Sequence, residues 1–148
     1  MAYEQIWTAF NQEFPQYANA AREAWQFGVD PDLLAQLVVS GEKTATSSYF
    51  AEYMHEREAV PSVGEINLIL GAQNQPKVIT INTKVVLQPY AKVDEEIGYL
   101  EGEGTRDLAY WRAVHEPFFT EVAQSIGKTF SPDDLIVTEF FEVLKVLS

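Results

Sequence analysis

Residues 30–48, DPDLLAQLVVSGEKTATSS, join a helix-forming segment to one rich in small hydroxyl side chains. Asp30 is a favourable N-cap, Pro31 suits the first helical position, and apolar side chains follow at helical spacing. Gly41 suits the left-handed conformation in which many helices end. The stretch therefore predicts a short helix that stops at Gly41, directly before Lys43 and a run of hydroxyl residues.

The rest of the chain predicts a mixed order of helices and strands. Helical spacing indicates helices over residues 3–12 and 17–25, and a further helix after residue 49. β-Branched residues favour a hairpin over residues 65–88 and a last strand over 135–147. Between them a helix follows residue 107, and Pro117 should kink or split it. This order predicts one α+β domain over residues 1–148 with a small antiparallel or mixed sheet, and argues against a doubly wound nucleotide fold.

Composition restricts the partners. The 148 residues carry a net charge of −12 with only ten Lys and Arg, so binding to duplex DNA is disfavoured, whereas a local pocket for a nucleoside or short single strand stays open. No apolar run is long enough to span a membrane, and the N-terminus lacks the pattern of a signal peptide. The absence of cysteine excludes disulfides and thiolate metal sites. We therefore expect a cytoplasmic protein with no membrane partner.

Several familiar catalytic patterns are missing. Gly41 and Lys43 do not have Walker spacing, because no glycine lies upstream and a helix rather than a strand precedes them. His55 and His115 are far apart in the sequence and lack zinc-protease spacing, so each is interpreted as a packing or surface residue. No nucleophile elbow supports a serine triad. We therefore expect neither a metal nor a cofactor.

Lys43 and Thr46 are the remaining candidate pair. Residues three apart share a face in a helix or turn but not in a strand, so a functional pair requires a turn at residues 43–46 and a strand that begins near Thr46. Threonine needs a base to become a nucleophile, and lysine serves only if it loses its proton. Otherwise Lys43 would bind an anion or carbonyl as a cation. A solvated helix end before a threonine-rich strand is the simpler interpretation.

Residues 99–111, YLEGEGTRDLAYW, form a second motif with two interpretations. One is a glycine-containing loop that leads into a helix capped by Asp107. The other is a ligand site in which glycines allow close approach, carboxylates accept hydrogen bonds from amines or hydroxyls, an arginine binds phosphate and an aromatic ring stacks on a base. The residues in those roles would be Glu101, Glu103, Arg106, and Tyr110 or Trp111.

The two motifs, in this order and at this distance, resemble the ASCH domain family, in particular its small stand-alone bacterial members. The resemblance covers about residues 26–146 and leaves residues 1–25 as an N-terminal helical extension. It implies a PUA-like small β-barrel with flanking helices, whose central cleft is proposed to bind RNA or a nucleobase. This goes further than the α+β class indicated by the sequence pattern.

The family signature is G-x-K-x-x-E-x-R. Gly41 and Lys43 match it, whereas Thr46 replaces the glutamate and Ser48 the arginine. A related branch hydrolyses the acetyl amide of N4-acetylcytidine with a threonine nucleophile, the lysine and a later glutamate, which corresponds to Glu103. The resemblance thus implies Thr46 as nucleophile, Lys43 as base and Glu103 as polarising group. The missing arginine at Ser48 leaves the substrate open, and Arg106 could replace it.

Together these observations predict a domain that binds a nucleoside or short single-stranded RNA and hydrolyses an amide of a modified nucleoside. The alternatives are a non-catalytic RNA or nucleotide-binding module, a ribonuclease, and an acidic surface for a protein partner. A homodimer through the aromatic N-terminal helices also stays open. Besides the three catalytic candidates, the predicted ligand-binding residues are Gly41, Thr44, Ser48, Glu101, Arg106, Tyr110 and Trp111.

Overall fold

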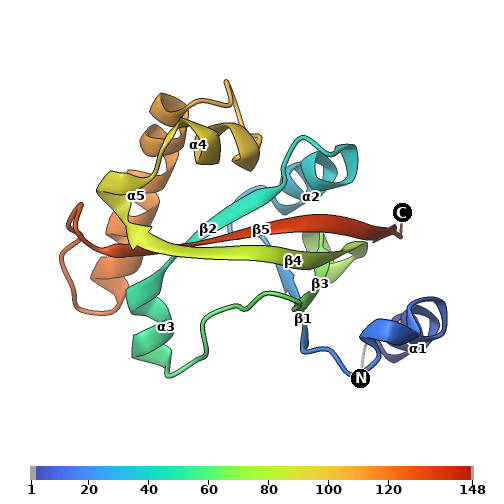
Figure 1. Cartoon of the computed structure of the whole chain (residues 1–148). Coiled ribbons are helices and arrows are strands. Elements are labelled where there is room, and N and C mark those ends of the chain that lie inside the picture. The colour runs from blue at the N-terminus through green and yellow to red at the C-terminus, as the bar shows by residue number, and fades with distance from the viewer. Residues whose placement is uncertain (1–2, 148) are drawn as a thin grey trace.

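The computed structural model describes residues 3–147, which form a five-stranded mixed sheet curled into a half-barrel with helices around it (Figure 1). The strand order is β1-β3-β4-β5-β2. The strands are β1 (Arg22–Gln26), β2 (Ala45–Tyr49), β3 (Ile66–Leu70), β4 (Pro76–Pro89) and β5 (Leu135–Val146). The α-helices are α1 (Glu4–Glu13), α2 (Pro31–Ser40), α3 (Phe50–Glu56), α4 (Glu95–Glu101) and α5 (Leu108–Ser125). Short 3₁₀ turns cover Pro15–Tyr17, Ala72–Asn74 and Tyr90–Lys92.

The long strands β4 and β5 give the sheet its curl. β1 pairs with β3 in parallel, and the other three pairings are antiparallel. The β4–β5 register shifts twice, between Ile79 and Thr80 and between Asn82 and Lys84. Such irregularities bend a strand and increase its twist, so the sheet wraps around its concave side. The predicted α+β class and the hairpin over residues 65–88 are confirmed.

The helix predicted over residues 17–25 is wrong. Arg22–Gln26 is the strand β1, and only Pro15–Tyr17 turns helically before it. Ala24 packs in the cluster beneath α1, whereas Trp25 packs in the cluster beneath α2, so successive side chains point to opposite faces as in any strand. Alanine and aromatic residues mimicked helical spacing here, and pairing with β3 decides the conformation.

The helices agree with the sequence more closely, with three differences. α2 begins after Asp30 and ends at Gly41, whose φ of 84° is left-handed as predicted, but the Asp30 side chain makes no capping hydrogen bond. α5 is one helix with Pro117 inside it, so the proline does not split it. α4 was not predicted, because residues 95–101 looked like the approach to a loop. The predicted cap at Asp107 is confirmed by its hydrogen bond from the Tyr110 amide.

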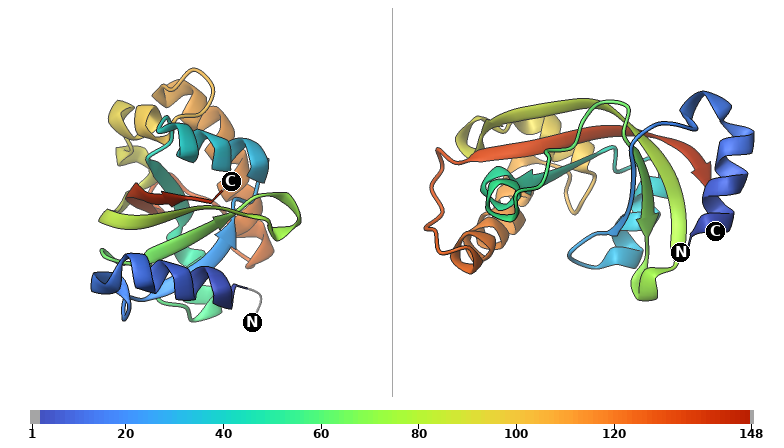
Figure 2. Two further views of the ribbon diagram at one scale, coloured as in Figure 1. Left: turned by 90° about the vertical axis from the view of Figure 1, so that its right-hand side faces the viewer. Right: turned by 90° about the horizontal axis from the view of Figure 1, so that it is seen from below.

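Apolar side chains pack on both faces of the sheet. α1 covers β3 and β4 at the end of the half-barrel far from α5, with Phe10 against Ile66 and Leu68 (Figure 2). α2 packs against Ile69 and Val78, and α5 packs on β2 and β5. Within residues 3–147, no helix is long and apolar enough to cross a membrane. The region between α2 and α5, above β2, is left for a cavity.

Candidate active site

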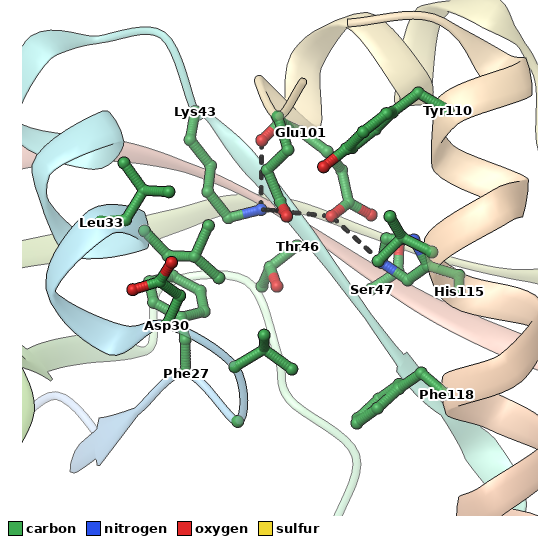
Figure 3. A pocket seen from close by; sticks show the side chains of 15 residues that line it. Phe27, Asp30, Leu33, Lys43, Thr46, Ser47, Glu101, Tyr110, His115 and Phe118 are labelled. Atoms are coloured by element: carbon green, nitrogen blue, oxygen red, sulfur yellow. Dashed lines mark hydrogen bonds and ion pairs between the residues drawn. The ribbon is translucent and has the colours of Figure 1, made fainter. Parts of the chain in front are cut away.

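A cavity of about 300 Å³ lies between α2 and α5, with β2 as its floor (Figure 3). Its apolar side consists of aromatic and aliphatic side chains from the β1–α2 connection, α2 and α5. Its polar side carries two carboxylates, a lysine, a histidine and two hydroxyls, and a third carboxylate, Asp30, lines it from the β1–α2 connection. The apolar residues are Phe27, Leu33, Leu34, Val114 and Phe118, and the polar ones named here are Lys43, Thr46, Ser47, Glu101, Glu103 and His115.

Lys43 lies at the polar side although its side chain is almost completely buried, at 1% exposure. The turn after α2 places it, because the Lys43 amide donates to Leu37 O at 3.0 Å and the next amide donates to Leu100 O at 2.8 Å. Lys43 Nζ donates to Glu101 O at 3.1 Å, to Glu101 Oε1 at 3.2 Å and to Glu103 Oε2 at 2.8 Å. These acceptors match the three N–H donors of an ammonium group.

Glu101 is the buried centre of this network. It ends α4 and is 1% exposed, and its Oε2 accepts a hydrogen bond from Trp111 Nε1 at 2.6 Å. Burial alone would raise the pKa of Glu101, but the charge of Lys43 and the contact with His115 outweigh burial and hold that pKa well below its usual value. These contacts favour the ionised form of Glu101 at the polar side of the cavity.

His115 is the functional candidate that sequence reasoning missed. Its Nδ1 lies 2.8 Å from Trp111 O, which can only accept, so Nδ1 carries a proton. Its Nε2 lies 3.6 Å from Glu101 Oε1, and its ring stacks on Trp111 at 4.3 Å. Burial would lower the pKa of His115, but the hydrogen bond and charge of Glu101 outweigh it and raise the pKa. No sequence signal marks this role, because Glu101 and His115 meet only through the packing of α4 against α5.

Thr46 brings a hydroxyl to the same cavity. It is the second residue of β2, and its side chain points into the space bordered by Lys43, His115 and Phe118 (Figure 3). Among residues 3–147 its hydroxyl has no hydrogen-bond partner, whereas the neighbouring Ser47 hydroxyl is 2.9 Å from that of Thr138. The strand begins at Ala45, one residue before the predicted position. Lys43, Thr46 and Glu103 thus line one cavity, but only Lys43 and Glu103 are hydrogen-bonded to each other.

The comparisons decide the family. The ASCH domain family model matches residues 23–145. The chain is 36% identical to a protein from Enterococcus faecalis V583, whose crystal structure superposes with a TM-score of 0.86 over 97% of this chain and 88% of that one. It is 30% identical to an ASCH domain from Lactobacillus crispatus JV V101, with a TM-score of 0.84 over 95% of this chain and 89% of that one. The chain belongs to the ASCH domain family.

A more distant ASCH protein, from Zymomonas mobilis, is 10% identical and superposes with a TM-score of 0.51 over 87% of this chain and 73% of that one. At that identity the likeness shows the fold alone. No curated protein matches the chain. The family and its PUA-like fold are therefore secure for this ASCH domain, and its chemistry has to be argued from the cavity.

Five of the residues predicted to bind ligand lie outside the cavity of this ASCH domain. The Arg106 side chain donates to Glu42 O at 3.0 Å and Tyr99 O at 3.2 Å and lies over the Tyr99 ring, so these contacts hold it against the loop and outside the cavity. Trp111 is 2% exposed and cannot stack on a base. The other three, none of which lines this cavity, are Gly41, Thr44 and Ser48. Glu101, Glu103 and Tyr110 do line it.

A second cavity of about 330 Å³ adjoins the first, and the two share the lining residues Phe27, Gly28, Thr46, Ser47 and Phe118. Ser48 lies here, with its hydroxyl 2.8 Å from that of Tyr53. The remaining lining is strongly acidic, with Glu23, Glu52, Glu58, Glu65 and Glu139. Within the described part of the ASCH domain, no group of three or more acidic, histidine or cysteine side chains is arranged to hold a metal ion.

Proposed function

We propose that the first cavity binds a nucleoside, free or within a short single-stranded RNA, and that Thr46 hydrolyses an amide on a modified base of the N4-acetylcytidine kind. The observation that carries the proposal is the unpartnered Thr46 hydroxyl, which shares a small, half-apolar cavity with a buried lysine, three carboxylates and a histidine. Such a combination of apolar walls and a few convergent polar groups is typical of a small-molecule site.

Recognition would divide between the two sides of the cavity. Phe27 and Phe118 offer apolar surface to a flat ring, and Tyr110 adds an aromatic face (Figure 3). Glu103, whose side chain is 18% exposed, can accept a hydrogen bond from an amine through its second oxygen. Both ring nitrogens of His115 already face Trp111 O and Glu101, so His115 would orient Glu101 instead of contacting the substrate. The cavity volume lies at the lower end of the range for such sites, which favours one nucleoside over a longer strand.

In the proposed reaction Thr46 Oγ1 forms a bond to the acyl carbon while its proton passes to a base. The C–N bond then breaks, and the amine leaves with a proton. Water hydrolyses the acyl-threonine ester, which releases the carboxylic acid and restores the hydroxyl. Because three acceptors surround Lys43 Nζ, the lysine is placed to stabilise the developing oxyanion as a cation instead of serving as the base.

One observation favours a second candidate, the non-catalytic binding module. The Thr46 hydroxyl has no hydrogen bond to a base among residues 3–147, so the resting cavity contains no preassembled nucleophile. A binding module would use the same walls and the same charged groups. The two candidates differ in one measurable respect, which is whether the bound nucleoside is converted.

Chromatography of N4-acetylcytidine incubated with the purified protein tests the proposal. Wild type should form cytidine and acetate, Thr46→Ala should form neither, and Thr46→Ser should keep activity because it keeps the hydroxyl. Thr83→Ala is the matched control, since Thr83 is an exposed residue of β4. Absence of conversion by wild type rejects the hydrolase, and calorimetric binding of cytidine without conversion would favour the binding module.

A further inference from the structure

The proposed reaction needs a group that takes the proton of Thr46, and most of the titratable side chains of the first cavity are already bound to one another. Lys43 and Glu103 are bound to each other at 2.8 Å, and Glu101 is committed to Lys43 and Trp111. His115 carries a proton on Nδ1 and directs Nε2 at a carboxylate. The remaining carboxylate, Asp30, lies in the β1–α2 connection, which does not pair with β2, whereas strand pairing can place a base on the other side of Thr46.

The register of β2 and β5 places Glu139 directly opposite Thr46. In an antiparallel pair such residues project from the same face, with Cβ atoms about 4.5–5.5 Å apart. Both residues line the second cavity, whereas only Thr46 also lines the first. A substrate carbonyl in the first cavity and a carboxylate in the second would therefore approach the Thr46 hydroxyl from different sides.

A chain of buried amides orients the Glu139 carboxylate. Trp25 Nε1 donates to Asn67 Oδ1 at 3.1 Å, and Asn67 Nδ2 donates to Asn82 Oδ1 at 3.0 Å. Asn82 Nδ2 then donates to Glu139 Oε1 at 3.0 Å. Asn67 and Asn82 are each 1% exposed, so this chain of hydrogen bonds across β1, β3, β4 and β5 is shielded from water and holds the carboxylate in one orientation. Glu139 is thus held by an orienting amide and lies opposite the nucleophile, and substrate binding would have to bring Thr46 Oγ1 and the carboxylate into hydrogen-bonding reach.

The surroundings of Glu139 raise its pKa toward neutral pH. It is 7% exposed, and burial raises its pKa to about 7, with Glu65 and Glu23 adding repulsion and Asn82 opposing the shift. Tyr53 from α3 also faces it, and Glu52 and Glu58 line the same cavity. No lysine or arginine lines this cavity among the described residues. A carboxylate in such a state can both take and return a proton near neutral pH.

We propose that Glu139 is the general base and acid for Thr46, an inference that rests on the proposed hydrolysis. The Thr46 proton moves to a Glu139 oxygen as Oγ1 bonds to the acyl carbon, and the same proton is given to the departing amine as the C–N bond breaks. In the second half, Glu139 takes a proton from water as the water oxygen bonds to the ester carbon, and it returns the proton to Thr46 Oγ1 as the ester bond breaks.

The test uses p-nitrophenyl acetate, an activated ester that needs no nucleoside recognition. The Thr46-dependent rate is the wild-type rate minus that of Thr46→Ala, followed between about pH 5 and about pH 9. We expect a rise with an inflexion near pH 7 in wild type and a loss of about 100-fold or more in Glu139→Gln. Glu142→Gln, an exposed change on the same strand, should leave the rate unchanged.

A second variant acts through Glu139 without replacing it. Glu65→Gln removes the neighbouring charge that raises the pKa of Glu139, so the inflexion should move to lower pH. An unchanged rate in folded Glu139→Gln, or no Thr46-dependent rate in wild type, overturns the inference. If circular dichroism shows that Glu139→Gln does not fold, an unshifted inflexion in Glu65→Gln overturns it.

The ester also separates this inference from the proposed function. If ester hydrolysis depends on both Thr46 and Glu139 but N4-acetylcytidine is not converted, the proposed substrate is wrong and the role of Glu139 as the base is supported. If Glu139→Gln converts N4-acetylcytidine at the wild-type rate, Glu139 is not the base and the proposed hydrolysis is supported.

Discussion

Replacement of Lys43 by methionine should destabilise the domain strongly. Methionine keeps the length of the buried stem but removes the charge, so Glu101 loses the cation that lies 3.2 Å from its Oε1. Both side chains are at most 2% exposed. Breaking a buried ion pair by removing one partner typically costs about 3–5 kcal/mol, because the other charge remains buried.

The lower end of that range fits this network. Glu101 keeps the hydrogen bond from Trp111 and the contact with His115 Nε2, and Glu103 can turn toward solvent. We therefore expect a loss of about 3 kcal/mol for Lys43→Met, or about 6–12 °C in melting temperature for a domain of this size. Because the pKa of Glu101 is lowered in the folded state, its ionised form stabilises the fold above the pKa of the unfolded chain, and this stabilisation is lost as the pH falls. The difference in unfolding free energy between wild type and Lys43→Met should therefore become smaller in acid.

Urea unfolding followed by far-ultraviolet circular dichroism measures the change. Lys145→Met is the matched control, because the Lys145–Glu13 pair has side chains that are 34% and 49% exposed and should contribute less than about 1 kcal/mol. A double-mutant cycle of Lys43→Met with Glu101→Gln should give a coupling of about 2 kcal/mol or more. A loss of stability in Lys43→Met as small as that in Lys145→Met would mean that the buried Lys43–Glu101 pair contributes no more than an exposed one.

Three further predictions concern stability. A Cβ at Gly102 would lie 2.2 Å from Glu42 O at a φ of +74°, whereas a Cβ at Gly41 would meet nothing within 4 Å. Gly41→Ala should therefore cost about 1–2 kcal/mol for its left-handed backbone alone. Gly102→Ala should lower the melting temperature much further. The raised pKa of Glu139 means that the folded state keeps a proton which the unfolded chain releases, so Glu139→Gln should match wild type near pH 4 and exceed it by up to about 3 kcal/mol above pH 7 in urea titrations. Because the pKa of His115 is raised, its protonated form stabilises the fold most below about pH 6.5. The loss of unfolding free energy in His115→Gln should therefore become smaller as the pH rises, and a loss that is independent of pH would contradict this prediction.

The fold was predictable from the sequence wherever local chemistry and tertiary packing agree. The helix that ends at Gly41 and the hairpin over residues 65–88 have strong local signals, and both are present. β1 was not predictable, because a five-residue strand becomes one only by pairing with β3. α4 was missed because its glycine and its acidic start suggest a loop, although Asp94 caps it.

The candidate site was predictable in its composition but not in its geometry. The motifs identified Lys43, Thr46 and Glu103, which do line one cavity. Sequence spacing could not show that three oxygens surround Lys43 Nζ, and it gave no indication of His115. Glu139 was not predictable from the sequence for a similar reason, because its place opposite Thr46 follows from the pairing of β2 with β5.

The central claim is that Thr46 forms a covalent acyl intermediate in a nucleoside cavity. The most direct test is acid quenching of wild-type protein mixed with N4-acetylcytidine, followed by mass spectrometry of the peptide that contains residue 46. We expect a transient mass increase of one acetyl group on Thr46 that is absent in Thr46→Ala. Cytidine formation with no acyl-threonine at any time, or no cytidine formation at all, would contradict it.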